Sequence, residues 1–230
     1  MLVANVGGLY LGLEMVTSAD EFADKIIKEM YGVLNKKLKS ASFRTSLTRG
    51  TKTILEENLR KQDTFVDMVA EDGKLRNQLG VVDSVSAMES LVNTWVASTQ
   101  VTFGAPRIVG HEIRGSIFTI RAIDASYKDV LSETWAWYTT EKDKVIPWLD
   151  WLLLHGQEIL VMGYVSKKVK RYTPASRTDT NVIMVQTKGL GWGIPEQYAG
   201  VSGNNFATKA VASAAPEILD MMESEARRRI

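Results

Sequence analysis

Apolar residues recur every three or four positions in the stretch that follows Ser18. Ser18 stands three residues before Glu21, which is the spacing of a capping box at the start of a helix. The pattern predicts an α-helix over about 18 to 38 with a single apolar stripe. This stripe consists of Phe22, Ile26, Ile27, Met30, Val33, Leu34 and Leu38.

Two further helical patterns follow this first helix. One runs from Ser42 to Leu59, although Gly50 weakens it by about 1 kcal/mol relative to alanine. The other, over 63 to 79, predicts two short helices with a break at Asp72 and Gly73, and Gly80 acts as the stop.

Another helix is expected before residue 100. Ser86 and Glu89 repeat the capping-box spacing, and the apolar period ends near Ser98. The first hundred residues are therefore predicted to be mostly helical. The buried side of this last helix would consist of Met88, Leu91, Val92, Trp95 and Val96.

After Ser98 the chain becomes rich in β-branched and aromatic residues bounded by Gly, Pro, Asp and Ser, which is typical of strands. One helical pattern interrupts them over Lys144 to Leu154, where Pro147 is tolerated in the first turn. We predict an antiparallel sheet of four or five strands. These strands are Val101 to Phe103, Glu112 to Asp124, Glu133 to Thr139, Ile159 to Val169 and Asn181 to Gln186.

A loop and a last helix fill residues 188 to 230, and the helix keeps its apolar period across Pro216. No linker of disordered composition and no internal repeat separates the parts of the chain. We therefore predict one α+β domain over 1 to 230. A helical N-terminal half (about 18 to 98) packs on an antiparallel β-sheet (about 99 to 187), and the long C-terminal helix closes the fold.

Composition narrows the function classes. Hydrophobic residues make up 45% of the 230 residues, and 28 basic residues against 27 acidic ones give a net charge of +1, so no chain-wide field favours nucleic acid or anionic lipid. The absence of cysteine excludes disulfides, thiolate nucleophiles and zinc ribbons.

The first 13 residues carry no charge and are mostly apolar. Gly7, Gly8 and Gly12 interrupt this apolar stretch, and no Lys or Arg precedes it. We therefore expect an arm or strand of a soluble protein instead of a signal peptide.

Catalytic patterns are weak in this sequence. His111 and His155 are the two histidines and have no metal-ligand spacing, although His155 and Glu158 form a possible acid–base pair. The stretch 200 to 203 departs from a nucleophile elbow, and the glycines over 189 to 193 depart from phosphate-binding loops. We therefore expect no enzyme, cofactor or metal, with a hydrolase using His155 as an alternative.

A basic cluster lies near the end of the fourth predicted strand. It combines Lys167, Lys168, Lys170 and Arg171 with the aromatic ring of Tyr172. These side chains could contact nucleic-acid phosphates, or they could prevent an edge strand from pairing with another chain. Both interpretations remain open from the sequence.

Six tryptophans provide more aromatic surface than a small sheet needs to bury. Trp135 and Trp137 are two residues apart on a predicted strand and would share a face, and Trp148 and Trp151 share a short helix. Trp192 lies in the glycine-rich loop, where an anchor between subunits is plausible because Trp is enriched at interface hot spots.

Two motifs resemble a known family. The first is Leu75 to Asp83 (LRNQLGVVD), followed by a tryptophan-bearing helix. The second combines Trp192 to Pro195 (WGIP), Ala199-Gly200 and Asn204 to Ala210 (NNFATKA) ahead of an amphipathic helix. Both motifs are similar to those of the neck or tail-completion proteins of tailed bacteriophages, which join head and tail. The resemblance does not extend over residues 124 to 172.

The resemblance implies a non-enzymatic virion structural protein, assembled in the host cytoplasm, that forms a ring with copies of itself at the head–tail junction. A hexamer is favoured, with connector or portal proteins on one side, tail-tube or sheath proteins on the other, and DNA passing through the lumen without sequence-specific binding. Either Asn204 or Asn205 would cap the last helix. The candidate subunit interface is Trp148, Trp151, Trp192, Pro195, Tyr198 and Phe206, and the candidate DNA-facing residues are Lys167, Lys168, Lys170 and Arg171.

Overall fold

The structure is a computed structural model that describes residues 2–6, 9–13, 19–110, 112–114, 118–121, 127–140, 142–169 and 182–227. The chain divides into two compact units, which are described separately below. Unit 1 comprises Met1–Ser46 and Val101–Thr119, and unit 2 comprises Leu47–Gln100 and Ile120–Ile230. The expected single domain over 1–230 stays a prediction.

Unit 1 is built around helix α1. The predicted first helix is confirmed, because α1 extends from Ala19 to Lys39. Four residues of its apolar stripe, Phe22, Ile26, Met30 and Val33, are exposed, whereas Leu38 at its end is buried. Two short hairpins complete the unit: β1 (Leu2–Val6) with β2 (Leu9–Leu13), and β4 (Arg107–Val109) with β5 (Glu112–Arg114).

Three elements each contain a boundary between the units. Helix α2 (Ala41–Arg60) contains the boundary at Ser46 and Leu47. The other two boundaries lie in β3 (Gln100–Phe103) and β6 (Phe118–Arg121), which pair with each other. Within unit 1, the guanidinium of Arg44 lies over the ring of Phe103, 5.2 Å from its centroid. This cation–π contact ties the start of α2 to β3.

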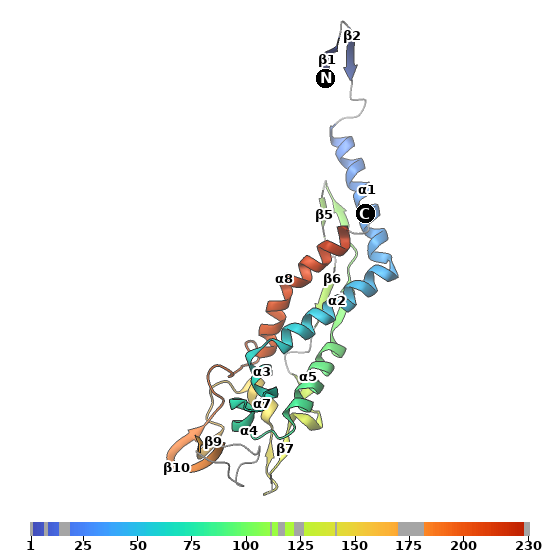
Figure 1. The fold of residues 1–230 in the computed structure, drawn as a ribbon. Coiled ribbons are helices and arrows are strands. Elements are labelled where there is room, and N and C mark those ends of the chain that lie inside the picture. The colour runs from blue at the N-terminus through green and yellow to red at the C-terminus, as the bar shows by residue number, and fades with distance from the viewer. Residues whose placement is uncertain are drawn as a thin grey trace. The chain divides into compact units, whose positions relative to one another are not determined.

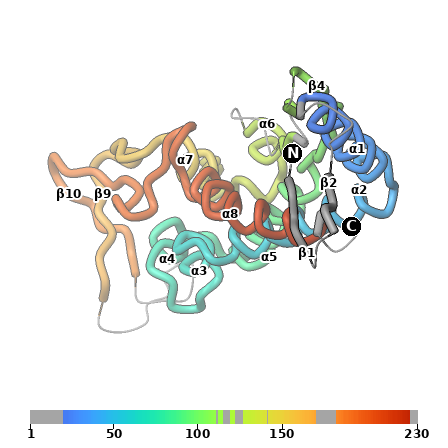
Figure 2. The backbone as a smooth tube through the Cα atoms, turned by 90° about the horizontal axis from the view of Figure 1, so that it is seen from above, coloured from blue at the N-terminus to red at the C-terminus, as the bar shows by residue number. Residues whose placement is uncertain are grey.

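Unit 2 combines helices with two antiparallel hairpins (Figure 1). Figures 1 and 2 both show β9 and β10 as a pair that extends away from the helices of this unit. Together with the long C-terminal helix, these elements confirm the predicted α+β class. The helices are α3 (Asp63–Val69), α4 (Lys74–Leu79), α5 (Ser84–Ser98), α6 (Lys128–Leu131), the 3-10 turn η1 (Thr134–Ala136), α7 (Trp148–Leu154) and α8 (Phe206–Arg227). The hairpins pair β7 (Tyr138–Thr139) with β8 (Val145–Ile146) and β9 (Val161–Lys168) with β10 (Val182–Trp192).

Several predicted helix boundaries are confirmed in unit 2. The expected pair of short helices is α3 and α4, and they are separated around Asp72 and Gly73. Gly80 ends α4 with a φ of 69°, a left-handed conformation that glycine adopts without steric cost. Helix α5 ends at Ser98, as the apolar period predicts.

The predicted strand over Glu133 to Thr139 is wrong over most of its length. Thr134 to Ala136 form the turn η1, and only Tyr138 and Thr139 pair as a strand. Trp135 and Trp137 therefore do not share a strand face. In addition, the strands of the described residues pair two at a time instead of forming one larger sheet. Turns and short helices between the strands keep each hairpin separate.

The predicted helix over Lys144 to Leu154 starts later than expected. Val145 and Ile146 belong to β8, Pro147 is the N-cap, and α7 begins at Trp148. The physical reason is that a residue before proline is disfavoured in the α conformation, so the helix cannot extend back through Ile146.

The predicted capping box of Ser86 and Glu89 is also wrong, because α5 begins at Ser84 with Asp83 as N-cap. Glu89 turns instead toward the neighbouring helix and accepts a hydrogen bond of 2.7 Å from the Arg60 guanidinium. This hydrogen bond with Arg60 holds the pKa of Glu89 below its usual value. The ion pair links α2 to α5 inside unit 2.

The core of unit 2 is rich in aromatic rings from distant parts of the sequence. Trp95 of α5 makes edge-to-face contacts with Tyr127 and Phe206, at centroid distances of 6.1 and 6.5 Å. Trp148 is 1% exposed, and its indole N–H donates a 3.0 Å hydrogen bond to the carbonyl of Trp135. Helices α5, α7 and the start of α8 therefore share one apolar interior with Tyr127.

Asn205 caps the C-terminal helix and lies at the centre of a polar network inside this core. Its Oδ1 accepts hydrogen bonds from the backbone N–H groups of Ala207 (3.1 Å) and Thr208 (3.0 Å), which confirms the predicted cap. Its Nδ2 lies 2.7 Å from Tyr127 Oη and 3.2 Å from the carbonyl oxygens of Leu153 and Val201. The residue is 0% exposed. Its hydrogen bonds with Tyr127, Leu153 and Ala207 are buried, and those with Val201 and Thr208 are partly buried.

We expect Asn205→Ala to lower the free energy of unfolding by about 2 to 3 kcal/mol, because it removes a helix cap and leaves buried acceptors and donors without partners. Urea denaturation followed by circular dichroism measures this loss. The matched control is Asn204→Ala, since Asn204 is exposed, and it should change stability by no more than about 0.5 kcal/mol. Equal losses in the two variants would refute the role of the network.

Candidate assembly interface

Three of the six candidate interface residues are folded into the chain's own core. Trp148, Trp192 and Phe206 are only 1%, 7% and 4% exposed. The interior of unit 2 already covers these rings. A subunit interface uses apolar area that the single chain leaves exposed, and an interface role for these three residues stays a prediction.

The segment between Trp192, the last residue of β10, and Phe206, the first residue of α8, packs as a closing loop. The predicted loop therefore starts later than residue 188, because Lys188 to Trp192 belong to β10. Trp192 tilts against Trp151 at a centroid distance of 6.3 Å, and its carbonyl accepts a 2.8 Å hydrogen bond from the N–H of Leu160. A Cβ at Gly200 would lie 2.5 Å from Asn205 Cβ and 2.7 Å from the carbonyl oxygen of Leu152, so only glycine fits. The motif residues thus have a structural task within the chain.

The other three candidates are half-buried on this loop and on α7. Pro195 starts a turn in which its carbonyl accepts hydrogen bonds from the N–H groups of Tyr198 (2.9 Å) and Ala199 (3.0 Å). Burial raises the pKa of the Tyr198 phenol. An interface role for Trp151, Pro195 and Tyr198 stays a prediction.

Trp151 lines an open hollow of about 250 Å³ at the base of the β9–β10 hairpin. Its walls come from α4, the β7–β8 hairpin, α7 and the long hairpin, and most of them are apolar. Polar atoms on the wall include the Oε1 of Gln78, which is buried without a hydrogen-bond partner. The lining residues are Gln78, Leu79, Tyr138, Ile146, Trp151, Val161, Tyr164, Met184 and Trp192.

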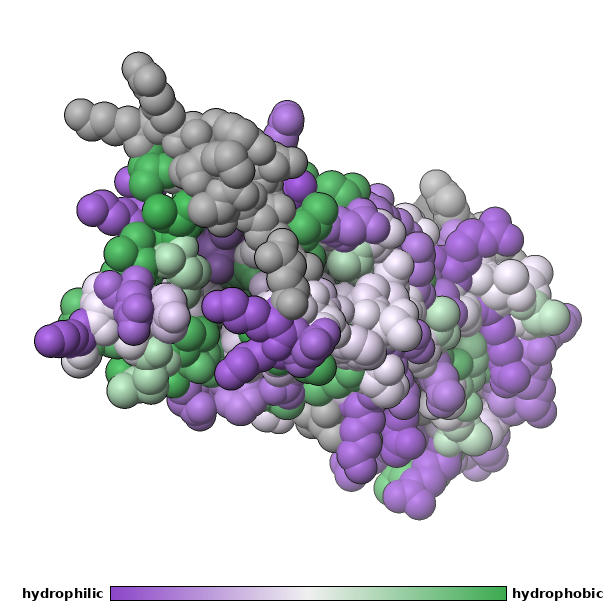
Figure 3. Space-filling view, turned by 90° about the horizontal axis from the view of Figure 1, so that it is seen from below, coloured by the Kyte–Doolittle hydropathy of each residue, from purple (hydrophilic) through white to green (hydrophobic). Residues whose placement is uncertain are grey.

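Large apolar side chains are exposed to solvent on the same hairpin and just before it. Met162 is 69% exposed, Ile159 61% and Leu190 58%. Figure 3 shows hydrophobic surface on the end of unit 2 that carries this hairpin, among hydrophilic side chains. We refer to Ile159, Met162 and Leu190 together with the hollow as the hairpin surface. This hairpin surface was not predicted from the sequence, although the apolar residues of β9 and β10 could have indicated it.

The basic cluster is described only in part. Lys167 and Lys168 are exposed on β9, opposite Ile183 and Val182 of β10, whereas Lys170 and Arg171 lie outside the described residues. In the described residues β9 pairs with β10 alone, which leaves its other edge unpaired. The phosphate-binding and edge-protecting interpretations of these lysines both stay predictions.

His155 lies between two carboxylates at the end of α7. Its Nδ1 is 3.1 Å from Glu158 Oε2, as the sequence pair suggested, and its Nε2 is 2.8 Å from Asp150 Oδ2. The hydrogen bond to Glu158 and the bond and charge of Asp150 raise the pKa of His155, against the opposing effect of its partial burial. Because both ring nitrogens are engaged by carboxylates, the imidazolium form is favoured, which suits an ion-pair contact better than a general base.

Asp150 was missed as a partner of His155 because it stands five residues earlier, outside the usual helical pair spacing. The other histidine, His111, lies outside the described residues. Within the part of the chain that the structure describes, no group of three or more His, Asp or Glu side chains is placed to hold a metal ion.

Comparisons with protein-family models, curated proteins and solved structures found no match to this chain. None of the helices in the described ranges combines the length and the apolar character that crossing a bilayer requires.

The pH dependence of stability tests the His155 contacts. Because the folded pKa of His155 is raised above 6.5, the native state binds the proton more tightly, so its stabilisation is fully present below pH 6.5 and is lost as the pH rises through the folded pKa. We expect the free energy of unfolding of wild type to exceed that of His155→Gln by about 0.5 kcal/mol at pH 6. The difference is small because the groups are partly exposed. It should disappear by about pH 9. Urea denaturation at both pH values measures the difference.

A control at about 0.5 M NaCl should reduce the difference at pH 6, because salt screens partly exposed charges. A wild-type advantage that stays constant or grows with pH would contradict the assignment.

Proposed function

We propose that the chain is a non-enzymatic structural subunit of a tailed-phage neck, which assembles with copies of itself into a ring around the DNA channel. The observation that carries the self-assembly is the hairpin surface, where Ile159, Met162 and Leu190 are more than half exposed and other residues of the β9–β10 hairpin line an apolar hollow. Exposed apolar patches are typical of protein–protein contact sites.

The geometry of the hairpin surface favours a contact that repeats from copy to copy. One chain presents both a hollow and free apolar side chains, and these are different patches. When a side chain of one copy enters the hollow of the next, the contact is heterologous, and such contacts close into rings if the rotation permits. The resemblance of the motifs at Leu75–Asp83 and Trp192–Ala210 to neck proteins supports the proposal that this ring, for which a hexamer is favoured, belongs to the head–tail junction of a virion.

DNA passing through the lumen is the second part of the proposal. The near-neutral net charge of +1 suits a channel that lets DNA move without strong electrostatic retention. Lys167 and Lys168 are the described candidates for facing the DNA. The ring would lie between connector or portal proteins and tail-tube or sheath proteins.

Mass photometry of the purified chain tests the assembly directly. Wild type is expected to form a ring-sized oligomer at micromolar concentration, also visible by negative-stain electron microscopy. The double substitution Met162→Ser with Leu190→Ser should weaken association by at least about tenfold, since each buried apolar side chain contributes about 1.5 to 3 kcal/mol. The monomer should keep its circular dichroism spectrum, because both side chains are exposed.

The matched control is Leu219→Ser on α8, where the leucine is 61% exposed but lies away from the hairpin. This variant should assemble like wild type. A wild-type chain that remains monomeric, or a control that disrupts assembly as strongly as the double variant, would overturn the proposal.

A further inference from the structure

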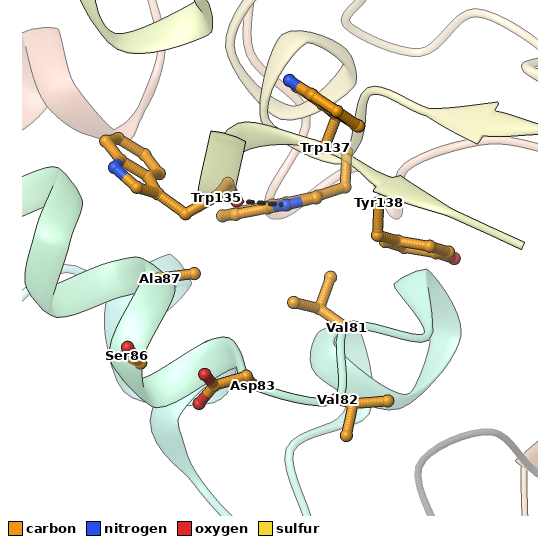
Figure 4. Close-up of a pocket in the computed structure, with 9 residues that line it drawn as sticks. Val81, Val82, Asp83, Ser86, Ala87, Trp135, Trp137 and Tyr138 are labelled. Carbon is orange, nitrogen blue, oxygen red and sulfur yellow. Dashed lines mark hydrogen bonds between the residues drawn. The ribbon is translucent and has the colours of Figure 1, made fainter. Parts of the chain in front are cut away.

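A second hollow in unit 2 has a different chemical character from the one at the hairpin. It measures about 270 Å³ and lies between the start of α5 and the segment around η1. Figure 4 shows Trp135, Trp137 and Tyr138 on one side of the hollow, and Asp83, the N-cap of α5, and Ala87 of α5 on the other. Trp148 is a further lining residue, but it is only 1% exposed, so the accessible aromatic side chains of the hollow are Trp135, Trp137 and Tyr138.

The polar groups of this hollow are oxygen atoms on the α5 side. Asp83 is the N-cap of α5, yet its side chain makes no capping hydrogen bond. An Asp at this position ordinarily accepts hydrogen bonds from the first turn of its helix. Here the exposed carboxylate and the exposed hydroxyl of Ser86 line the hollow instead. The wall therefore offers hydrogen-bond acceptors and one negative charge.

Aromatic rings opposite a carboxylate select a cation. The faces of Trp and Tyr carry negative electrostatic potential and attract cationic groups, and Trp is the strongest of the aromatic residues in this respect. A quaternary ammonium would use the rings but has no N–H to donate to Asp83. A lysine ammonium is strongly hydrated, whereas a guanidinium is weakly hydrated, stacks on aromatic rings and gives two parallel N–H groups to one carboxylate.

The described part of the chain already contains this combination around Arg60. The Arg60 guanidinium lies 5.5 Å from the centroid of the Phe65 ring and pairs with the carboxylates of Glu56 at 3.0 Å and Glu89 at 2.7 Å. An arginine entering the second hollow would find the same two elements, an aromatic face and a carboxylate.

We propose that the hollow formed by Trp135, Trp137, Tyr138, Trp148, Asp83 and Ser86 binds an arginine side chain of a partner protein. The guanidinium stacks on the partly exposed rings of Trp135 and Trp137 and donates hydrogen bonds to the Asp83 carboxylate. Tyr138 lines both this hollow and the one at the hairpin, whereas Ile159, Met162 and Leu190 do not line this site. Binding here does not depend on self-assembly, so its test is independent of the proposed function.

A titration monitored by NMR tests the site with a small probe. The full-length chain, labelled with ¹⁵N, is titrated with N-acetyl-arginine methylamide, and the indole N–H signals of Trp135 and Trp137 are assigned with Trp→Phe variants. We expect both signals to shift, with a dissociation constant on the order of 1 mM for the isolated residue. The citrulline analogue has nearly the same shape without the charge, and it should leave both signals in place.

Substitutions separate the charge from the shape of the hollow. Asp83→Asn should weaken arginine binding by about tenfold while preserving the other indole signals. Asp129→Asn, an exposed carboxylate on α6, is the matched control and should bind like wild type. Trp137→Leu, which removes a ring that is 38% exposed, should also weaken binding.

Any one of four results would overturn the proposal. The first is equal shifts with the citrulline and arginine probes, and the second is unchanged affinity in Asp83→Asn. The third is binding of choline as tight as that of the arginine probe, because choline has no N–H for the carboxylate and would identify a quaternary-ammonium site instead. No shift with any probe, in a wild-type chain that retains its native spectrum, would also reject the site.

Discussion

The buried side-chain amide of Asn205 holds unit 2 together. One fully buried residue caps α8 through Oδ1 and joins Tyr127, Leu153 and Val201 through Nδ2. An amide this deep in an apolar interior is tolerated only when its hydrogen-bonding groups are satisfied. The network therefore fixes where the C-terminal helix begins and how the closing loop from Trp192 lies against α7. Gly200 makes the fit possible, because a side chain there would collide with Asn205.

This constraint decides which aromatic residues remain available to partners. Trp192 and Phe206 are used to close the core, and Trp148 belongs to the same interior. The apolar side chains that stay exposed in unit 2 include Ile159, Met162 and Leu190 on and just before the β9–β10 hairpin. A two-stranded hairpin is at best marginally stable alone in water. A neighbouring copy that covers the hairpin surface would both bury its apolar side chains and support its strands.

The sequence predicted local features better than long-range ones. The period of three to four residues located α1, α3, α4 and α8, and Asn205 was identified as a possible cap, because these features depend on neighbours along the chain. Trp135 and Trp137 were wrongly assigned to a strand because two aromatic residues two positions apart are typical of a strand. The turn η1 that they form part of or follow is stabilised by a hydrogen bond from the distant Trp148 to the Trp135 carbonyl. Burial of Trp192 and the closeness of Asp150 to His155 arise from tertiary packing. Gly50 weakens α2 in isolation, yet it gives Met221 of α8 room to approach.

Oxidative footprinting of the dilute chain and of its assembled form, read residue by residue by mass spectrometry, tests the account most directly. Met162 and Met184 on the hairpin, both exposed in the single chain, should react readily when dilute and become protected on assembly, while Trp192 should resist oxidation in both forms. A Trp192 that reacts in the dilute chain and gains protection only on assembly, with unchanged reactivity at Met162 and Met184, would show that the closing loop and not the hairpin forms the subunit contact.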